Sequence, residues 1–427
     1  MAIIVQSQPE TYGLAYNDNI YVIRHSVPTP TIRLKVIVST LWTAAAPPET
    51  IATLVVYPTP ATTGATDRSF FDVSRVVQSQ LNTTFRLVNT ANLSFYYGGG
   101  GIFGYKVTLV EQDVDANGNY VDGSSTQLAP KFVWDGGIDM REWLDFDIDT
   151  YLMDTGVGNH SFLTEGPTGT DYRDIGTDES ACLCFISEEN NAPLGYYLTT
   201  YSDFDAGGTQ LSNAFVTNYN AGSISSGISE KYGRVYVGTS NIPNIIASQM
   251  SGGTPSTILN GVKSYSIRMW DSSLPISEVV TFNIGKKCSK YTPVRLHWLN
   301  RLGGFDSFNF NLLSEKNTKV DKKDYYKQPR TFSGTTWAYY KESSGVTRYD
   351  TQTSKSLTIN TDYITDVEST WMESLFTSPM VFQEVNGELA AVTVDGRSIT
   401  EQKSLNNKLN QYRFDINYSL KNTRQRG

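Results

Sequence analysis

Residues 291–310 read YTPVRLHWLNRLGGFDSFNF, and their pattern indicates a β-hairpin. Apolar residues alternate with polar ones over 294–298 and again over 308–310, which is the period of a half-buried strand. Between them, the NRLGGF sequence predicts a tight turn, because Gly303 and Gly304 can adopt backbone conformations that other residues avoid. The stretch therefore predicts a hairpin whose large aromatic side chains need a core to cover them.

The same alternation recurs along the chain and predicts a mainly β protein. It is clearest over 412–420, YRFDINYSL, where the apolar residues and Arg413, Asp415, Asn417 and Ser419 face opposite ways. Further strands are predicted at 32–38, 51–57, 105–109, 182–186, 196–201, 235–237 and 265–269.

Two segments have helical periodicity instead. Apolar residues recur at helical spacing over 364–376, and Thr365 with Glu368 forms a capping-box pair at the start. The spacing over 71–81 predicts a shorter helix, with Ser69 as its N-cap.

We expect two or three antiparallel β domains, sandwich-like, with a few short helices, since 427 residues exceed the usual size of one domain. Residues 1–136 are interpreted as an N-terminal β domain with one short helix. Residues 137–260 are interpreted as a loop-rich β domain, and long loops are usually functional or contact a neighbour. Residues 261–427 are interpreted as a C-terminal β domain with one helix.

The composition favours a surface that other subunits cover. Charged residues make up 18% of the chain, against about a quarter in a typical soluble protein, and there are 26 tyrosines. Interface cores lose charged residues and gain tyrosine and tryptophan, so this balance suits an assembly subunit. A soluble all-β monomer is the alternative interpretation.

The net charge of −8 argues against broad contact with nucleic acid, which needs a basic face. Lys and Arg do gather at 314–330, but acidic residues interrupt them, and we expect a solvated loop there. The N-terminal sequence MAIIVQSQPE lacks the features of a signal peptide. No stretch approaches the roughly 20 apolar residues of a membrane span.

Three cysteines cannot build a disulfide framework, which suits folding in a reducing cytosol. Cys182 and Cys184 would share one face of a strand. Together with the distant Cys288 they make poor evidence for a zinc site, and buried small residues are expected.

A partial calcium-loop pattern occurs at Asp113, Asp115, Asn117 and Gly118. Its twelfth position is Ser124 and not the glutamate that a calcium loop needs. Asn-Gly after a predicted strand is also a strong hairpin signal, so we favour a turn over a calcium site.

The remaining candidates for chemistry are weak. His25, His160 and His297 have no metal-ligand spacing, and His297 is expected to be packed or hydrogen-bonded. Acidic residues cluster in 134–149, WDGGIDMREWLDFDID. Two carboxylates near aromatic residues could form a glycosidase pair, but we favour the solvent-exposed side of an amphipathic element. We therefore predict no enzyme, no catalytic or metal site, and no cofactor.

The hairpin stretch at 291–310 resembles a segment of virion structural proteins from tailed phages that infect Bacteroides-type bacteria, crAss-like phages included. Two further stretches agree: FTSPMVF at 376–382 and the sequence from AVTVDG at 391 to 426, which ends in a basic tail. FFDVSRVVQSQL at 70–81 is a weaker match. The resemblance covers mainly the last third of the chain and departs in the loop-rich middle.

This resemblance implies a virion component, of the tail or of a ring or barrel joining head and tail. Its expected partners are copies of itself in a homo-oligomeric ring and other virion proteins, of the tail or portal side, with no membrane involved. The protein would be made in the host bacterial cytoplasm and located in the virion. The alternative is a receptor- or carbohydrate-binding tail or fibre module, since exposed tyrosines and tryptophans on Gly/Asn-rich loops suit sugar stacking.

Overall fold

The structure is a computed structural model, and its mainly β character, with 52% strand and 11% helix, confirms the predicted fold class. The sheets are separate and mostly antiparallel, and the helices are few and short. The description covers residues 3–25, 33–41, 47–59, 68–87, 94–98, 100–153, 158–187, 193–218, 231–271, 274–286, 290–328, 330–332, 334–339, 345–395, 410–420 and 422–425.

The chain divides into two compact units, which are described separately. Unit 1 contains residues 1–286 and 299–306, and unit 2 contains 287–298 and 307–427. The turn of the predicted hairpin thus belongs to unit 1, while most of its two strands belongs to unit 2. The finer division into 1–136, 137–260 and 261–427 stays a prediction.

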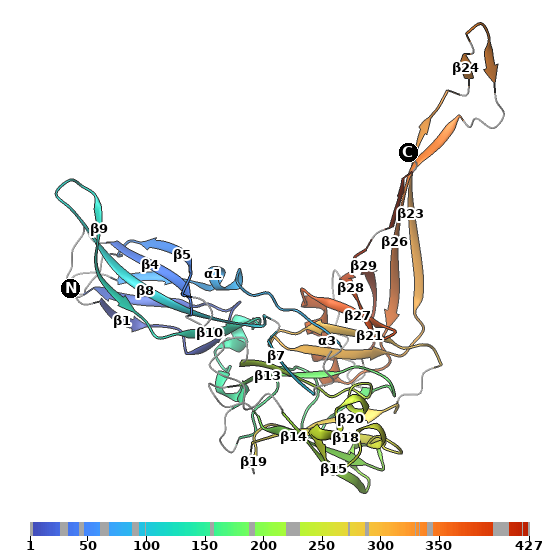
Figure 1. Ribbon diagram of the computed structural model, residues 1–427, viewed down its shortest axis with the longest axis horizontal. Helices are drawn as coiled ribbons and strands as arrows, with labels where there is room; N and C mark the ends of the chain where they lie inside the picture. The colour runs from blue at the N-terminus through green and yellow to red at the C-terminus, as the bar shows by residue number, and fades with distance from the viewer. Residues whose placement is uncertain are drawn as a thin grey trace. The chain divides into compact units, whose positions relative to one another are not determined.

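The first part of unit 1 holds two sheets around one apolar core (Figure 1). The three-stranded sheet has the order β1 (Ile3–Ser7), β3 (Ile20–His25), β6 (Arg68–Asp72). The six-stranded sheet has the order β2 (Tyr12–Leu14), β10 (Lys131–Trp134), β8 (Ile102–Val114), β4 (Arg33–Thr40), β5 (Thr50–Val56), with β9 (Tyr120–Gln127) paired to β8. Alternating buried residues of β4 supply much of this core, as the sequence predicted.

The predicted helix at 71–81 is shorter than expected, and its predicted cap is wrong. The helix α1 spans Ser74–Gln78, and Val73 occupies the N-cap position without a side-chain hydrogen bond. Ser69 lies in the strand β6 and is fully buried. The pairing of β6 with β3 continues to Asp72, so the backbone becomes helical only after that residue.

The second part of unit 1 holds two more sheets and the core between them. One has the order β11 (Leu152–Met153), β13 (Cys182–Ser187), β16 (Tyr232–Tyr236), β7 (Phe95–Tyr97). The other has the order β12 (Tyr172–Ile175), β20 (Val280–Ile284), β18 (Ser264–Asp271), β14 (Gly195–Tyr201), β15 (Gln210–Thr217), β17 (Met250–Ser251), with β19 (Leu274–Pro275) on β18. Short helices lie between the strands of unit 1: α2 (Met140–Trp143), η1 (Ile148–Tyr151), η2 (Phe204–Ala206), η4 (Ile242–Asn244), η5 (Ala247–Gln249) and η6 (Pro255–Thr257).

Unit 2 is built on one large sheet covered by a helix. The strand order is β22 (Phe305–Phe310), β21 (Val294–Leu299), β27 (Val381–Val385), β28 (Glu388–Asp395), β29 (Arg413–Tyr418), β26 (Val346–Asn360), β23 (Glu315–Tyr326), with β30 (Asn422–Gln425) on β26. A separate pair is formed by β24 (Arg330–Phe332) and β25 (Trp337–Tyr339). The helix α3 spans Asp366–Thr377, and the predicted capping box of Thr365 and Glu368 is present.

The expectation of a solvated loop at 314–330 is wrong, because β23 occupies most of this range. All twelve of its residues are exposed, so no apolar alternation marked it in the sequence. Its stabilisation comes from the backbone ladder to β26, whose register joins Glu315 to Thr358 and Tyr326 to Val346. Cross-strand ion pairs such as Arg348 with Asp324, at 2.9 Å, add to it.

Removing residues 412–427 is expected to prevent unit 2 from folding. The strand β29 lies between β28 and β26, and Tyr412, Phe414 and Ile416 are buried in its core. Each such side chain contributes roughly 1.5–3 kcal/mol on burial, and β28 and β26 would also lose their shared partner. Solubility and near-UV circular dichroism of the 1–411 chain measure the effect.

The matched control ends the chain at Leu420, which retains β29 and removes only β30. We expect this control to fold. A soluble 1–411 chain with the native near-UV spectrum would contradict the assignment of β29 as an essential central strand.

Candidate interaction surface

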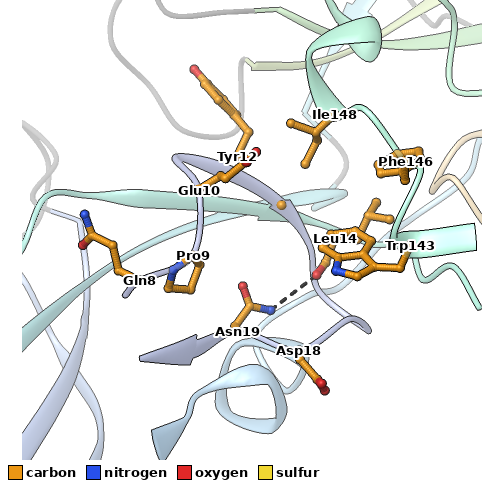
Figure 2. A pocket seen from close by; sticks show the side chains of 11 residues that line it. Gln8, Pro9, Glu10, Tyr12, Leu14, Asp18, Asn19, Trp143, Phe146 and Ile148 are labelled. Carbon is orange, nitrogen blue, oxygen red and sulfur yellow. Dashed lines mark hydrogen bonds between the residues drawn. The ribbon is translucent and has the colours of Figure 1, made fainter. Parts of the chain in front are cut away.

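Unit 1 has a pocket of about 260 Å³ between two segments that are far apart in sequence. Figure 2 shows residues of 8–19 on one side and residues of 143–148 on the other. The parallel pairing of β2 with β10 brings the two segments together. The lining residues are Gln8, Pro9, Glu10, Tyr12, Gly13, Leu14, Asp18, Asn19, Trp143, Phe146 and Ile148.

The pocket combines aromatic rings with carboxylates. The ring centroids of Trp143 and Phe146 lie 5.7 Å apart in a stacked pair, and both side chains are half-buried. Glu10 and Asp18 are exposed at the pocket. Asn19 is buried, and its side-chain amide donates to the Asn17 carbonyl oxygen at 2.9 Å. Such a lining suits a ligand with a cationic or hydroxylated group beside an apolar face.

Three residues of the acidic stretch at 134–149, Trp143, Phe146 and Ile148, form one wall of this pocket, and the stretch is amphipathic only in part. Ile148 is buried, and the aromatic residues face the pocket, while Asp145 and Asp149 are exposed. Met140 and Leu144, however, are exposed at 75% and 86%, which the alternation of the stretch did not predict.

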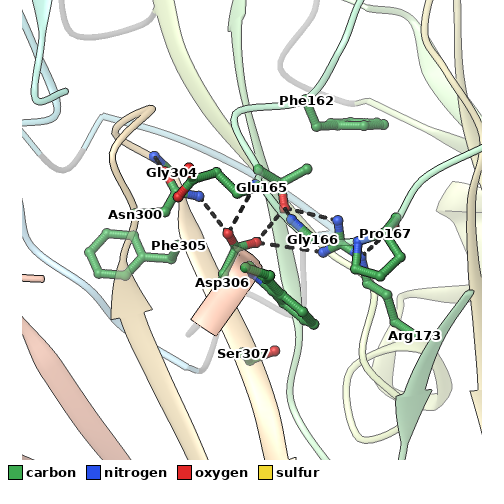
Figure 3. A network of polar contacts seen from close by, with 12 residues as sticks. Phe162, Glu165, Gly166, Pro167, Arg173, Asn300, Gly304, Phe305, Asp306 and Ser307 are labelled. Carbon is green, nitrogen blue, oxygen red and sulfur yellow. Dashed lines mark hydrogen bonds and ion pairs between the residues drawn. The ribbon is translucent and has the colours of Figure 1, made fainter. Parts of the chain in front are cut away.

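A buried polar network holds the NRLGGF turn within unit 1 (Figure 3). The Asp306 carboxylate accepts hydrogen bonds from the Asn300 amide at 2.7 Å, from the backbone N–H of Glu165 at 3.2 Å and from the Thr164 hydroxyl. Arg173 forms an ion pair with it at 3.6 Å and also donates to the Pro167 carbonyl oxygen. Burial lowers the pKa of Arg173, and Asp306 opposes that shift. The network is therefore a structural anchor with all its charges compensated.

The turn itself confirms the predicted role of its glycines. Gly303 has φ +83°, and a Cβ on Gly304 would lie 1.8 Å from the Leu163 carbonyl oxygen. The Trp134 indole donates to the Leu302 carbonyl oxygen at 2.8 Å, and the Tyr232 hydroxyl donates to that of Gly303 at 2.9 Å. The hairpin stretch thus needs its glycines for close packing as well as for turning.

The histidines and cysteines occupy structural positions where the structure describes them. His297 is buried, as predicted, and lies 3.0 Å from the Glu384 carboxylate. The His160 ring lies 3.2 Å from the Asp149 carbonyl oxygen. Cys182 and Cys184 are buried on β13, as expected. The His25 side chain and Cys288 lie outside the described residues.

The segment with the partial calcium-loop pattern is a hairpin turn between β8 and β9, as predicted. Asp115 accepts hydrogen bonds from the backbone N–H groups of Asn117 and Asn119, each at 2.8 Å, and Gly118 has φ +84°. Ser124 lies in β9 and donates to the Glu111 carboxylate. Among the described residues, no group of three or more His, Cys, Asp or Glu side chains is placed to hold a metal ion.

The most distinctive feature of unit 2 is a long β-ribbon of β23 and β26, called here, together with the β24–β25 pair, the arm (the described residues of 315–360). The central strand β29 pairs only with Ser356–Asn360 of β26, and the short strand β30 pairs with Asp350–Thr353, while β26 and β23 continue beyond both (Figure 1). Within the part of the chain that the structure describes, β23 pairs with β26 alone. The arm therefore presents one whole strand edge and its side chains to its surroundings.

The far end of the arm is aromatic. Phe332 and Trp337, from the β24–β25 pair, have ring centroids 5.3 Å apart and are exposed at 55% and 62%. Tyr326, at the end of β23, is exposed at 73%. Sequence reasoning missed this surface, although the β-branched content of 346–358 could have indicated a strand there.

Comparison with protein-family models and with curated protein sequences finds no match to this chain. In the described residues, no helix has the length and apolar character needed to cross a membrane.

We expect Gly304→Ala to destabilise unit 1 by more than about 3 kcal/mol, because the added methyl group would overlap a backbone oxygen that cannot move aside. Urea unfolding followed by tryptophan fluorescence measures the loss, since Trp134 lies against this turn. Gly118→Ala is the matched control. That glycine has a positive φ but open space around its Cβ position, so only backbone strain of about 1–2 kcal/mol is expected. Equal losses in the two variants would contradict the close packing of the turn.

Proposed function

We propose that this chain is a structural subunit of a tailed-phage virion, in the tail or in a head–tail ring, and that it works by binding copies of itself and other virion proteins. The observation that carries the proposal is the arm, a long β-ribbon with no core of its own. The resemblance of 291–310 and of the C-terminal stretches to phage virion proteins supports the same class.

The energetics of the arm favour a partner. Ordering each backbone residue costs about 1–2 kcal/mol, which folded proteins offset mainly by apolar burial. Beyond Ser356 the arm has only the four-residue strand β30 as a third strand, paired with Asp350–Thr353 of β26, and every residue of β23 is exposed. A ribbon with so little cover is marginal in water on its own. Cover from another chain would supply the missing burial.

The chemistry of the arm's end also suits protein contact. Interface cores are enriched in aromatic residues, which often contribute most of the binding energy. Phe332, Trp337 and Tyr326 offer such area at the end of a long support. The role proposed for the chain in the virion is non-enzymatic.

The pocket in unit 1 favours a second candidate function, that of a carbohydrate-binding module. Its half-buried Trp143 and Phe146 and its exposed carboxylates are groups that sugar sites use. A glycan array with the wild-type chain and Trp143→Ala tests this candidate. Binding that the substitution abolishes would favour a receptor-binding module.

Shortening the arm is expected to abolish self-association and to leave both units folded. Val320 pairs with Thr353, so joining these residues through an Asn-Gly turn removes 321–352 in register. Mass photometry across a concentration series should show oligomers for the full chain and monomers for the shortened one. Unchanged thermal melting of unit 1 serves as the folding control.

A substitution pair tests the same surface without deletion. Phe332→Ser combined with Trp337→Ser should weaken association by at least about tenfold, as expected when interface anchors are truncated. Leu211→Ser combined with Ile246→Ser, at other exposed positions, is the matched control and should have no effect. A full-length chain that stays monomeric at all concentrations and is absent from purified virions would refute the proposed function.

A further inference from the structure

The net charge of −8 conceals a strong asymmetry along the chain. Residues 137–260 contain sixteen acidic and four basic residues, a net charge of −12. Residues 261–427 contain seventeen acidic and twenty-three basic residues, a net charge of +6. Two regions of one chain therefore have opposite charge, which is the condition for head-to-tail attraction between copies.

The acidic region concentrates its charge in one short segment of unit 1. We call this segment, residues 139–149, the acidic face, since it has five acidic residues and one arginine. Arg301 pairs with Glu142 at 3.2 Å, but it shares its charge with Glu165 at 2.6 Å, so Glu142 is only partly compensated. The exposed acidic residues Asp145 and Asp149 alternate with residues that line the pocket. Acidic groups, the exposed Met140 and Leu144, and an aromatic pocket thus adjoin one another.

The basic region concentrates part of its charge in the arm. Residues 315–360 contain nine basic and five acidic residues, a net charge of +4. Ion pairs within the arm, such as Lys323 with Asp350 at 3.3 Å, use one charge of each sign and leave this surplus unchanged. Lys316, Lys322 and Lys327 are exposed along it. The arm therefore offers cations and aromatic rings on one support.

We propose that the arm of one copy binds the acidic face and the adjoining pocket of a second copy, so that copies join head to tail. This inference rests on the proposed function and names its partner surface. The two surfaces are different patches of one chain, so the contact is heterologous and can close into a ring. Lysine or arginine side chains of the arm would meet the carboxylates and the Trp143 ring, which attracts cations. Met140 and Leu144 would meet the aromatic residues of the arm.

Charge reversal on either surface is expected to weaken self-association, and mixing the two variants is expected to restore it. The arm variant has Lys316→Glu, Lys322→Glu and Lys327→Glu, and the face variant has Asp145→Lys and Asp149→Lys. Each variant alone would place like charges opposite one another and raise the self-association Kd by at least about tenfold. In the mixture, the acidic arm meets the basic face and the native arm meets the native face, so both contacts are attractive again.

Sedimentation velocity of the full-length chains, alone and as a 1:1 mixture, measures these effects. Asp171→Lys with Asp178→Lys is the matched control, because it reverses two exposed acidic residues of the same region outside the acidic face. The control should associate like the wild type. Association of the wild type should also weaken between about 50 and 300 mM salt, since screening acts on exposed charges.

The results of this experiment distinguish a failure of the head-to-tail contact from a failure of the proposed virion role. A wild type that assembles while both variants assemble equally well overturns the contact and leaves the virion role in place. A mixture that fails to restore association, or a control as weak as the face variant, also overturns the contact. Reversals that change the sedimentation of monomers alone would point to a contact within one chain and overturn it as well. A wild type that never associates counts against both proposals.

Discussion

The fold of unit 1 depends on the buried Asp306 carboxylate. Removing a charge from water costs several kcal/mol unless hydrogen bonds and an opposite charge replace the solvent. Asn300, Thr164 and the Glu165 backbone supply the hydrogen bonds, and Arg173 supplies the charge. These groups come from parts of the chain more than a hundred residues apart, so the network fixes the place of the turn as well as its shape.

That constraint explains why the NRLGGF stretch looks so distinctive in the sequence. Asn300 serves the turn twice, since its side-chain oxygen accepts from the N–H groups of Leu302 and Gly304 while its amide donates to Asp306. Gly304 must lack a side chain because the Leu163 carbonyl oxygen fills the space. The sequence predicted the turn, the strands beside it and the need for glycine. It could not predict the carbonyl, because the contact joins residues 141 positions apart.

Prediction from the sequence succeeded for elements that bury one face, and it failed for elements that bury no face. The alternation of β29 and the capping box of α3 are local signals, and both elements are present. The strand β23 buries no residue, so nothing in its pattern distinguishes it from a loop, and its partner lies in a separate stretch of the chain. The pocket was hidden for a similar reason, because the pairing of β2 with β10 brings its walls together.

The uneven distribution of charge along the chain also affects how this protein would bind its partners. A low overall content of charge suggested an aromatic, weakly ionic exterior, but that average combines a strongly acidic region with a basic one. A surface that associated through apolar area alone would expose that area to every neighbour and would risk non-specific aggregation. On the arm, exposed lysines lie along β23, and exposed lysines on an edge strand oppose indiscriminate pairing. An acidic partner surface would remove that opposition, so the charges of the arm would select the partner and its aromatic residues would stabilise the contact.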